Sequence, residues 1–365
     1  FNTENEDNME KEKKSKIKKI LVNLTIFILL IILTFSLVLK DQDVSQIFSV
    51  AAKVKKQYIL FAVLAMSIYI LGEAVNITRI LKELGEKSKL ISNIRYTLIG
   101  FFFSAITPAA SGGQPMEIYY MHKDDISVAN STLALLMQLC SLQIVTITVG
   151  TISAVIHFEV LKSGLIYLLI LGIILNSSAL MLLIIAIFSK KLSEGLIKFA
   201  VKLLKFFRIP NVEKKQEKLE KELESYQTSA KYIKEHKILM LKTVITTVVQ
   251  MIAYYSVPYW IYLAFGLTEY NIFEILTLQA VLYATVSGIP SPGAVGVSEG
   301  GFLGIFKNVF PETIISSAML LTRGANFYLF IIISAIIVMI STFREKRIEK
   351  KQMQETEVLT EKSEK

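Results

Sequence analysis

Long apolar runs alternate with short lysine-rich segments along most of the chain. A helix of roughly 20 apolar residues crosses a hydrocarbon core that is about 30 Å thick, and runs of that length recur. The pattern therefore predicts an all-α polytopic membrane protein. We expect full spans at Ile20–Leu39, Tyr58–Ile77, Val128–Ile156, Leu165–Phe188, Ile238–Phe265 and Ile314–Thr342.

Two further apolar segments, 96–121 and 272–306, are interrupted by proline and glycine. The first contains SAITPAASGGQPMEIYYM and the second SGIPSPGAVGVSEGGFLGIF. Irregular backbone at membrane depth leaves polar groups unpaired unless protein or a watery cavity surrounds it. We therefore expect each segment to form a re-entrant, broken-helix hairpin that makes no net crossing. With about six full spans, this gives eight membrane elements.

The distribution of lysine and arginine predicts the orientation, because cytoplasmic loops carry an excess of positive charge. The basic N-terminus and the charged C-terminus are both expected in the cytoplasm. The expected divisions are an N-terminus at 1–19, a first membrane half at 20–189, an insert at 190–237, a second membrane half at 238–342 and a tail at 343–365.

Three full spans separate the two broken segments, so the hairpins are expected to enter the membrane from opposite sides. In each segment a glutamate follows a proline by nine positions, from Pro108 to Glu117 and from Pro290 to Glu299. Together these features predict an inverted repeat, which is a common plan among transporters.

The insert at 190–237 has two helical patterns. Apolar residues recur at helical spacing among lysines from Leu192 to Phe207, which is typical of a basic amphipathic helix at the membrane interface. From Glu213 to Lys237 a charged helix is expected. Its apolar positions recur at four-three spacing over barely two heptads, which favours a helical hairpin returning to the membrane over a partner-binding coiled coil. These positions are Leu219, Leu223, Tyr226, Ala230 and Ile233.

Composition narrows the function classes. Hydrophobic residues make up 53% of the chain, and the formal charge of +9 comes from lysines next to apolar spans, where lipid head groups rather than nucleic acid are the expected partners. The one cysteine, Cys140, excludes a disulfide within the chain. The first apolar run is expected to be an uncleaved anchor, because it is too long for a signal peptide. The histidines lack metal-ligand spacing and no hydrolase or nucleotide-binding motif occurs, so neither catalytic residues nor a metal or cofactor are expected.

The broken segments supply the first candidate site residues. Pro115 suits the first position of a helix, and Glu117 could then cap its free N–H groups. A helix that begins at mid-depth presents partial positive charge and can bind an anion such as phosphate. The expected head-group residues in these segments are Ser111, Gly112, Gly113, Gln114, Ser298 and Gly300, and the residues expected to shape the hairpins are Pro108, Pro115, Pro290, Pro292, Gly293 and Gly296. The alternative is that proline and glycine only kink a helix and that Glu117 only caps it.

Ionisable residues at membrane depth supply the second set, because each charge there costs at least about 2.5 kcal/mol unless it faces protein, water or a partner. Glu117, Glu299 and Arg323 stand out. Arg323 could hold phosphate in bidentate fashion or neutralise either glutamate, and the sequence leaves both possibilities open. Glu73 and Arg79 are secondary candidates, for which snorkelling at the cytoplasmic end of a span is the favoured interpretation.

Glycines recur four residues apart in the second broken segment, at Gly296, Gly300 and Gly304. This spacing lets helices approach closely. We expect this stripe to serve helix packing.

Four motifs carry a family resemblance: TPAASGGQPMEIYYM, PSPGAVGVSEGG, RILKELG and LLTRG. Over residues 17–343 the chain resembles the transmembrane region of the lysylphosphatidylglycerol synthase family, which includes the multiple peptide resistance factor and its flippase-like relatives. The resemblance implies a membrane domain that moves aminoacylated phosphatidylglycerol between leaflets. Full-length relatives add a soluble aminoacyltransferase domain, and its absence from this sequence argues against phosphatidylglycerol lysyltransferase activity.

The expected function is therefore a lipid translocase in the bacterial plasma membrane, with aminoacylated phosphatidylglycerol as substrate and resistance to cationic antimicrobial peptides as its consequence. The helix ends and Arg323 would hold phosphate, and Glu117 and Glu299 would hold a cationic aminoacyl group. A separate synthase would supply the lipid. The alternatives are a secondary transporter of a small solute or ion, a membrane-embedded transferase, and a scaffold acting through the charged insert.

Overall fold

The computed structural model describes residues 25, 49–107, 110–158, 165–189, 191, 194–195, 198, 202, 212–289 and 291–344. Several predictions lie wholly or largely outside these residues. They are the basic N-terminus 1–19, the span Ile20–Leu39, the amphipathic helix Leu192–Phe207, the tail after 344, and the prolines Pro108 and Pro290.

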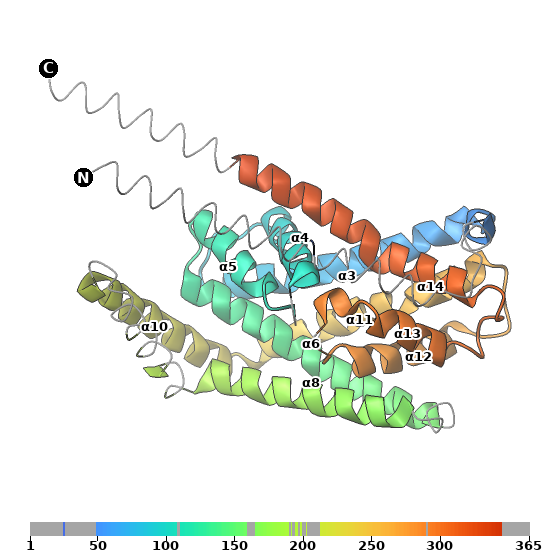
Figure 1. Cartoon of the computed structure of the whole chain (residues 1–365). Coiled ribbons are helices and arrows are strands. Elements are labelled where there is room, and N and C mark those ends of the chain that lie inside the picture. The colour runs from blue at the N-terminus through green and yellow to red at the C-terminus, as the bar shows by residue number, and fades with distance from the viewer. Residues whose placement is uncertain are drawn as a thin grey trace, which may run out of the picture.

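Every element in the described ranges is a helix (Figure 1). The first half contains α3 (Lys56–Glu83), α4 (Leu90–Ile106), α5 (Gly113–Lys123), α6 (Val128–Ile156) and α8 (Leu165–Phe188). Then follow α10 (Val212–Glu235), α11 (Lys237–Ala264), α12 (Ile272–Val286), the short helix η2 (Pro292–Ala294), α13 (Val297–Ile305), α14 (Ile315–Arg323) and a π-helical segment, η3 (Gly324–Tyr328).

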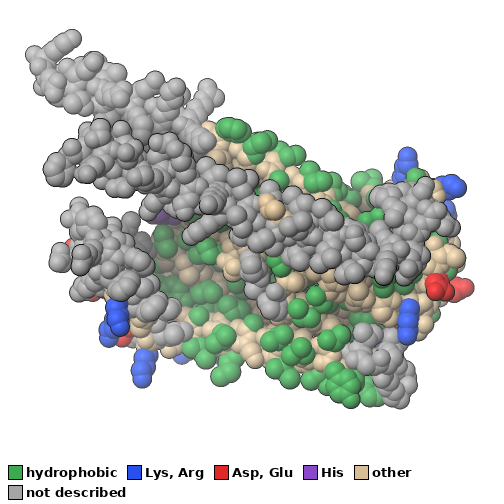
Figure 2. Space-filling view, viewed as in Figure 1, with side chains coloured by type: hydrophobic (Ala, Val, Ile, Leu, Met, Phe, Trp, Pro, Cys, Tyr) green, Lys and Arg blue, Asp and Glu red, His purple; other side chains and the backbone are tan. Residues whose placement is uncertain are grey.

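Five helices are long and apolar enough to cross a membrane. They are α3, α6, α8, α11 and the continuous helix Ile315–Arg344, which contains α14 and η3. These confirm five of the predicted spans. Apolar side chains cover much of the visible face, and charged ones gather toward its two ends (Figure 2).

The outward face of α11 shows how the sequence fits a lipid solvent. Its large exposed apolar residues recur at intervals of three and four, which places them on one face of the helix. They are Ile238, Leu241, Ile245, Val249 and Ile252. Exposing an apolar stripe of this kind to water is unfavourable, so we assign the stripe to contact with lipid.

Both broken segments form helical hairpins, as predicted. The arms of the first are α4 and α5, and those of the second are α12 and α13, joined through η2. The hairpins extend into the helix stack from opposite ends, and α4 packs against η2 where they meet (Figure 1). Their entry from opposite sides of a membrane, without a net crossing, stays a prediction. The inverted repeat, as a relationship between two sequences, stays a prediction.

Buried polar side chains join α3, α6 and α11. Asn76 donates to Gln138 Oε1 at 2.8 Å and to Thr247 Oγ1 at 3.0 Å, and Gln138 donates to Gln250 Oε1 at 3.3 Å. Gly72 permits the close α3–α11 crossing, since a Cβ there would lie 2.8 Å from Gln250 Cβ. In a membrane, such close packing and interhelical hydrogen bonds replace the hydrophobic effect as the force between helices.

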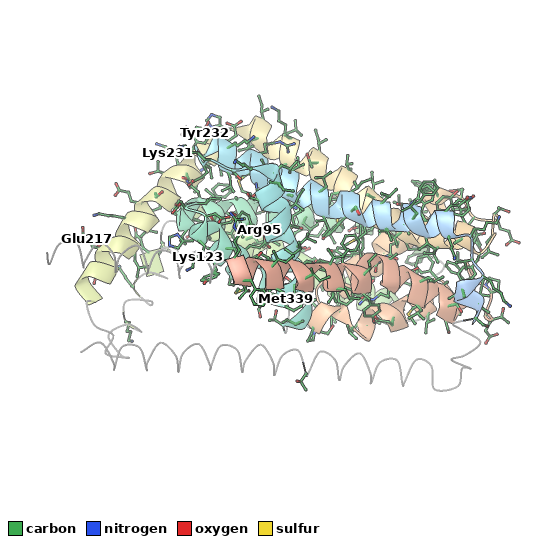
Figure 3. All side chains as sticks on the ribbon, turned by 90° about the horizontal axis from the view of Figure 1, so that it is seen from above. Arg95, Lys123, Glu217, Lys231, Tyr232 and Met339 are labelled. Atoms are coloured by element: carbon green, nitrogen blue, oxygen red, sulfur yellow. The ribbon has the colours of Figure 1, made fainter. Side chains whose placement is uncertain are left out.

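Helix α10 docks on the membrane helices through the end of its apolar stripe. Ala230 and Ile233 are buried, Tyr226 donates to the Ala186 carbonyl at 2.9 Å, and Ser229 donates to Asn130 Oδ1 at 2.7 Å. This contact favours the hairpin interpretation over a coiled coil with a partner. Lys231 and Tyr232 of α10 lie toward the same end of the molecule as Arg95 and Lys123 (Figure 3).

Candidate functional site

Glu299 is fully buried and accepts three hydrogen bonds. Arg323 Nε donates to its Oε1 at 2.7 Å, Tyr328 OH donates to the same oxygen at 3.2 Å, and the Gly296 N–H donates to Oε2 at 2.7 Å. The last bond makes Glu299 the cap of its own helix, α13. Of the roles that the sequence left open for Arg323, the structure shows neutralisation of Glu299.

The turn before α13 positions this ion pair. Arg323 Nη2 donates to the Gly293 carbonyl at 3.1 Å, and its guanidinium lies 4.0 Å from the centre of the Phe327 ring. Gly293 has φ 58°, and a Cβ there would overlap the Phe327 ring. Gly296, with φ 87°, also adopts the left-handed region that glycine tolerates best. Both glycines thus lie in the turn of the second hairpin with left-handed backbone, and Pro292 begins η2.

Glu117 is also buried but is bonded differently. Its side chain is 3% exposed, and its Oε2 has no hydrogen-bond partner among the residues that the structure describes. The carboxyl group lies against Gly100 of α4, where a Cβ would overlap Oε1. Burying a carboxyl oxygen without a hydrogen-bond donor costs free energy.

The prediction that Glu117 caps α5 is wrong. The helix begins at Gly113, not at Pro115, so Glu117 is the fifth helical residue and lies beyond the first turn. The N-cap Gly112 instead donates its N–H to Thr107 Oγ1 at 2.9 Å. The nine-residue spacing from proline to glutamate therefore leads to two different structural roles in the two hairpins.

A small cavity lies between α11, α12, α13 and α14, beside the Arg323–Glu299 pair. Its polar lining includes Tyr254, Gln279, Ser298, Thr322, Arg323 and Asn326, and about 20 Å³ is open to the centre of a water molecule. Within the described ranges, Oε1 of Gln279, Oγ1 of Thr322 and Oδ1 of Asn326 are buried without hydrogen-bond partners. Each such group costs about 1–3 kcal/mol, so the cavity favours a polar occupant.

A family model described as lysylphosphatidylglycerol synthase TM region matches residues 20–334. The chain belongs to this family. No curated protein matches the chain. The matched range contains both hairpins, the cavity and the ion pair. Membership indicates a membrane protein with a role connected to lipid.

In this lysylphosphatidylglycerol synthase TM region, the secondary candidates Glu73 and Arg79 separate. Arg79 Nη1 donates to Asn76 Oδ1 at 2.9 Å and to the Lys242 carbonyl at 3.0 Å, so it ties α3 to α11 rather than snorkelling freely. Glu73 is half-buried, has no hydrogen bond or ion pair in the described part of the chain, and lies within electrostatic range of Glu117. Glu73 is therefore grouped with Glu117, because the two carboxyl groups interact electrostatically.

The remaining predicted residues fall into different places. Ser298 lines the cavity and Gly113 packs against Ser104 of α4, whereas Ser111 and Pro115 are exposed and Gln114 is half-buried. The predicted packing role of Gly300 is wrong, because a Cβ there would meet no described atom within 4 Å. The close contact is made one position later, where a Cβ at Gly301 would lie 2.6 Å from Leu282.

Sequence reasoning missed Gln279, Thr322 and Asn326, since neutral polar residues are common in membrane helices. One signal was present: Thr322 and Asn326 flank Arg323 at positions that share a helix face. Asn326 lies in the π-helical segment that directly follows Arg323. Such segments occur often at functional sites, because they re-aim the side chains of a helix.

Tyrosines link the two parts of this family member's interior. The rings of Tyr69 and Tyr254 lie 5.2 Å apart, and those of Tyr254 and Tyr283 lie 5.3 Å apart. Tyr69 is within electrostatic range of Glu73, and Tyr254 is within range of Arg323 and Glu299. A cluster of phenol groups thus lies between Glu73 and the cavity.

Proposed function

We propose that this membrane region is a lipid translocase. Its substrate is a phospholipid that bears a cationic aminoacyl group, namely aminoacylated phosphatidylglycerol such as lysylphosphatidylglycerol, and it moves this lipid between the leaflets of the bacterial plasma membrane. The observation that carries the proposal is the buried Glu117 carboxyl, which lacks a hydrogen-bond partner at Oε2 among the described residues, in a protein whose hairpins reach its middle from opposite ends.

The unpaired carboxyl favours a cationic substrate. A charge at membrane depth is stable when an opposite charge compensates it. The charge of Glu299 is already compensated by Arg323, so we do not assign Glu299 as a ligand for the ammonium group. Glu117, with Glu73 nearby, is the position where a lysyl ammonium group would supply the missing partner.

The cavity supports recognition of the remainder of the head group. Arg323 uses two of its five N–H donors in its bonds to Glu299 and Gly293. Its other donors suit phosphate oxygens, whereas the oxygens of Gln279, Thr322 and Asn326 that lack partners among the described residues suit the hydroxyl groups of glycerol, which can donate to them. Because Glu299 neutralises Arg323, this part of the site recognises an anion through hydrogen bonds more than through net charge.

The cavity must open for this function, since about 20 Å³ holds a water molecule and not a head group. The contact between α4 and η2 is where the hairpins meet. Separation of the hairpins at this contact would open the site toward one membrane face or the other, which is the usual form of alternating access.

The biological consequence follows from electrostatics. Cationic lipid in the outer leaflet lowers the negative surface potential that attracts cationic antimicrobial peptides. An aminoacyl group is added by an enzyme, so the translocase would depend on a lipid-modifying synthase. In this scheme both chain termini are cytoplasmic.

Leaflet exchange in proteoliposomes tests the proposal. Labelled lysylphosphatidylglycerol should become accessible to a membrane-impermeant reagent faster than in protein-free vesicles, and Glu117→Gln should slow it. Equal accessibility with and without folded protein would contradict translocation. Mass spectrometry of the same lipids would reveal covalent modification, which the transferase alternative requires.

The small cavity favours one second candidate, a secondary transporter of a small polar solute. Solute uptake into proteoliposomes, with no change in the leaflet distribution of labelled lipid, would support it over the translocase.

A further inference from the structure

The interior holds glutamates in two contrasting environments. Glu299 receives three hydrogen bonds, one of them from a guanidinium. Glu117 is almost fully buried with Oε2 unpartnered in the described part of the chain, and the charged group facing it is another carboxyl, Glu73. The same chemical group is thus stabilised as an anion at one position and left without compensation at the other.

Within the described ranges, no lysine or arginine forms an ion pair with Glu73 or Glu117. The titratable groups near Glu73 are phenols, Tyr69 of α3 and Tyr283 of α12. On α4, Arg95 is bound to Asp124 at the end of the molecule where α10 docks. Arg323 pairs with Glu299, and Arg79 ties α3 to α11.

When a buried carboxyl group interacts with a second carboxyl group, desolvation and mutual repulsion both oppose ionisation of the two groups together. Two ligands relieve this conflict: a proton on one carboxyl oxygen, or a cation between the groups. The unpartnered Oε2 of Glu117 is the atom available for either one.

We propose that the Glu73–Glu117 pair is a proton-binding site and that it releases its proton when the ammonium group of the lipid binds. The inference rests on the proposed function for the identity of the lipid, and adds the driving force: lipid moves in one direction in exchange for a proton moving in the other.

The exchange balances in charge. One proton on two carboxyl groups leaves a single negative charge, and replacing that proton by one ammonium group again leaves a single negative charge. The O–H bond of the carboxyl breaks and the proton passes to water. The ammonium group keeps its own protons.

The tyrosine cluster offers a connection for this proton. Tyr69 lies near Glu73, and the Tyr254 and Tyr283 rings continue from it to the wall of the cavity. Hydroxyl groups both donate and accept hydrogen bonds, so together with water in the cavity they can carry a proton.

A pH gradient across proteoliposomes tests the coupling. With intact protein, lysylphosphatidylglycerol should accumulate in the leaflet that faces the acidic side, with about a tenfold ratio between leaflets for each pH unit, as one-for-one exchange requires. Glu117→Gln should abolish the accumulation. The matched control is Glu83→Gln, at the exposed end of α3, which should leave it unchanged. Lipid exchange that ignores the gradient would overturn the coupling and leave the translocase intact.

A second readout does not depend on transport. Difference infrared spectroscopy should show loss of a protonated carboxyl band when lysylphosphatidylglycerol is added to intact protein, and no such loss in Glu117→Gln. Circular dichroism would confirm that the variant is folded. Absence of a carboxyl band in intact protein would overturn the proton site. A band that lysyl lipid leaves unchanged would overturn the exchange.

Discussion

Arg323 and Glu299 form an ion pair with a nitrogen–oxygen distance of 2.7 Å, and both side chains are buried. The pair joins α14 to α13, and through Gly296 and Gly293 it also holds the turn of the second hairpin. The first hairpin has no matching bond to Oε2 of Glu117 within the described residues. This asymmetry between the two hairpins is the basis of the account.

Breaking the pair should destabilise the protein. Arg323→Ala leaves Glu299 buried without its cation, and loss of one partner in such a pair costs about 3–5 kcal/mol. The thermal midpoint in detergent should fall clearly. The double variant Arg323→Met with Glu299→Gln should recover part of the loss, because it removes both charges. A single variant as stable as the intact protein would show that the pair is not formed in solution.

Removing the other carboxylate should have the opposite effect on stability. Glu117→Gln deletes an uncompensated acid and keeps the size of the side chain, so the thermal midpoint should stay the same or rise. Glu299→Gln, the matched change, should lower the midpoint, since it weakens the bonds from Arg323 and Gly296. Equal losses in the two variants would mean that Glu117 has partners like those of Glu299.

Glycine substitutions test the position of Glu117. Gly100→Ala places a methyl group where the Glu117 carboxyl lies, and that flexible side chain can move aside. Lipid exchange should fall severalfold while the protein stays folded. The control is Gly300→Ala, where no described atom lies within 4 Å of the new methyl group. This variant should change neither lipid exchange nor folding. Normal exchange by Gly100→Ala would place the functional carboxyl elsewhere.

The sequence was sufficient to predict the spans and hairpins because each rests on a local pattern. Runs of apolar residues defined α6, α8 and α11 almost to their ends, whereas α3 continues beyond the predicted Ile77 to Glu83. The broken segments were recognised from proline and glycine, and counting the spans between them predicted that they enter from opposite ends.

The site was harder to predict because it depends on contacts between distant segments. Nothing local distinguishes Glu299, which meets Arg323 24 positions away, from Glu117, which does not. The start of α5 at Gly113 instead of Pro115 was enough to change Glu117 from a cap to an interior residue. The electrostatic interaction between Glu73 and Glu117 was also missed, because the position of Glu73 near the end of the predicted span Tyr58–Ile77 favours snorkelling unless the neighbouring helices are known.

Apolar substitutions of the cavity residues should lower lipid exchange without lowering the stability of the protein. Asn326→Leu replaces a buried amide whose Oδ1 is unpartnered among the described residues, so its effect on the thermal midpoint should be small or favourable. Lipid exchange should fall at least severalfold, since the polar occupant loses a hydrogen-bonding group. Unchanged exchange in both Asn326→Leu and Gln279→Leu would exclude the cavity from the site.

The stability of the protein should depend on pH through His157, which follows the end of α6 and contacts the second hairpin. Its Nε2 lies 2.7 Å from Thr277 Oγ1 of α12. Burial lowers the pKa of His157 below its usual range, partly opposed by Glu274. The unfolded state therefore binds a proton before the folded state does, so this histidine reduces stability as the pH falls below about 6.5.

His157→Gln checks this effect, because glutamine can keep a bond to Thr277 without titrating. The thermal midpoint of the intact protein should fall more than that of the variant between about pH 7.5 and about pH 5.5. Identical pH dependence in the two proteins would show that His157 does not contribute.

The most direct test of the account compares two lipids in one vesicle assay. The exchange rate of lysylphosphatidylglycerol is divided by that of phosphatidylglycerol, for the intact protein and for Glu117→Gln. The ratio should lie well above one for the intact protein and fall toward one in the variant, because only the lysyl lipid brings an ammonium group to the Glu117 carboxyl. An identical ratio in the two proteins would contradict this prediction.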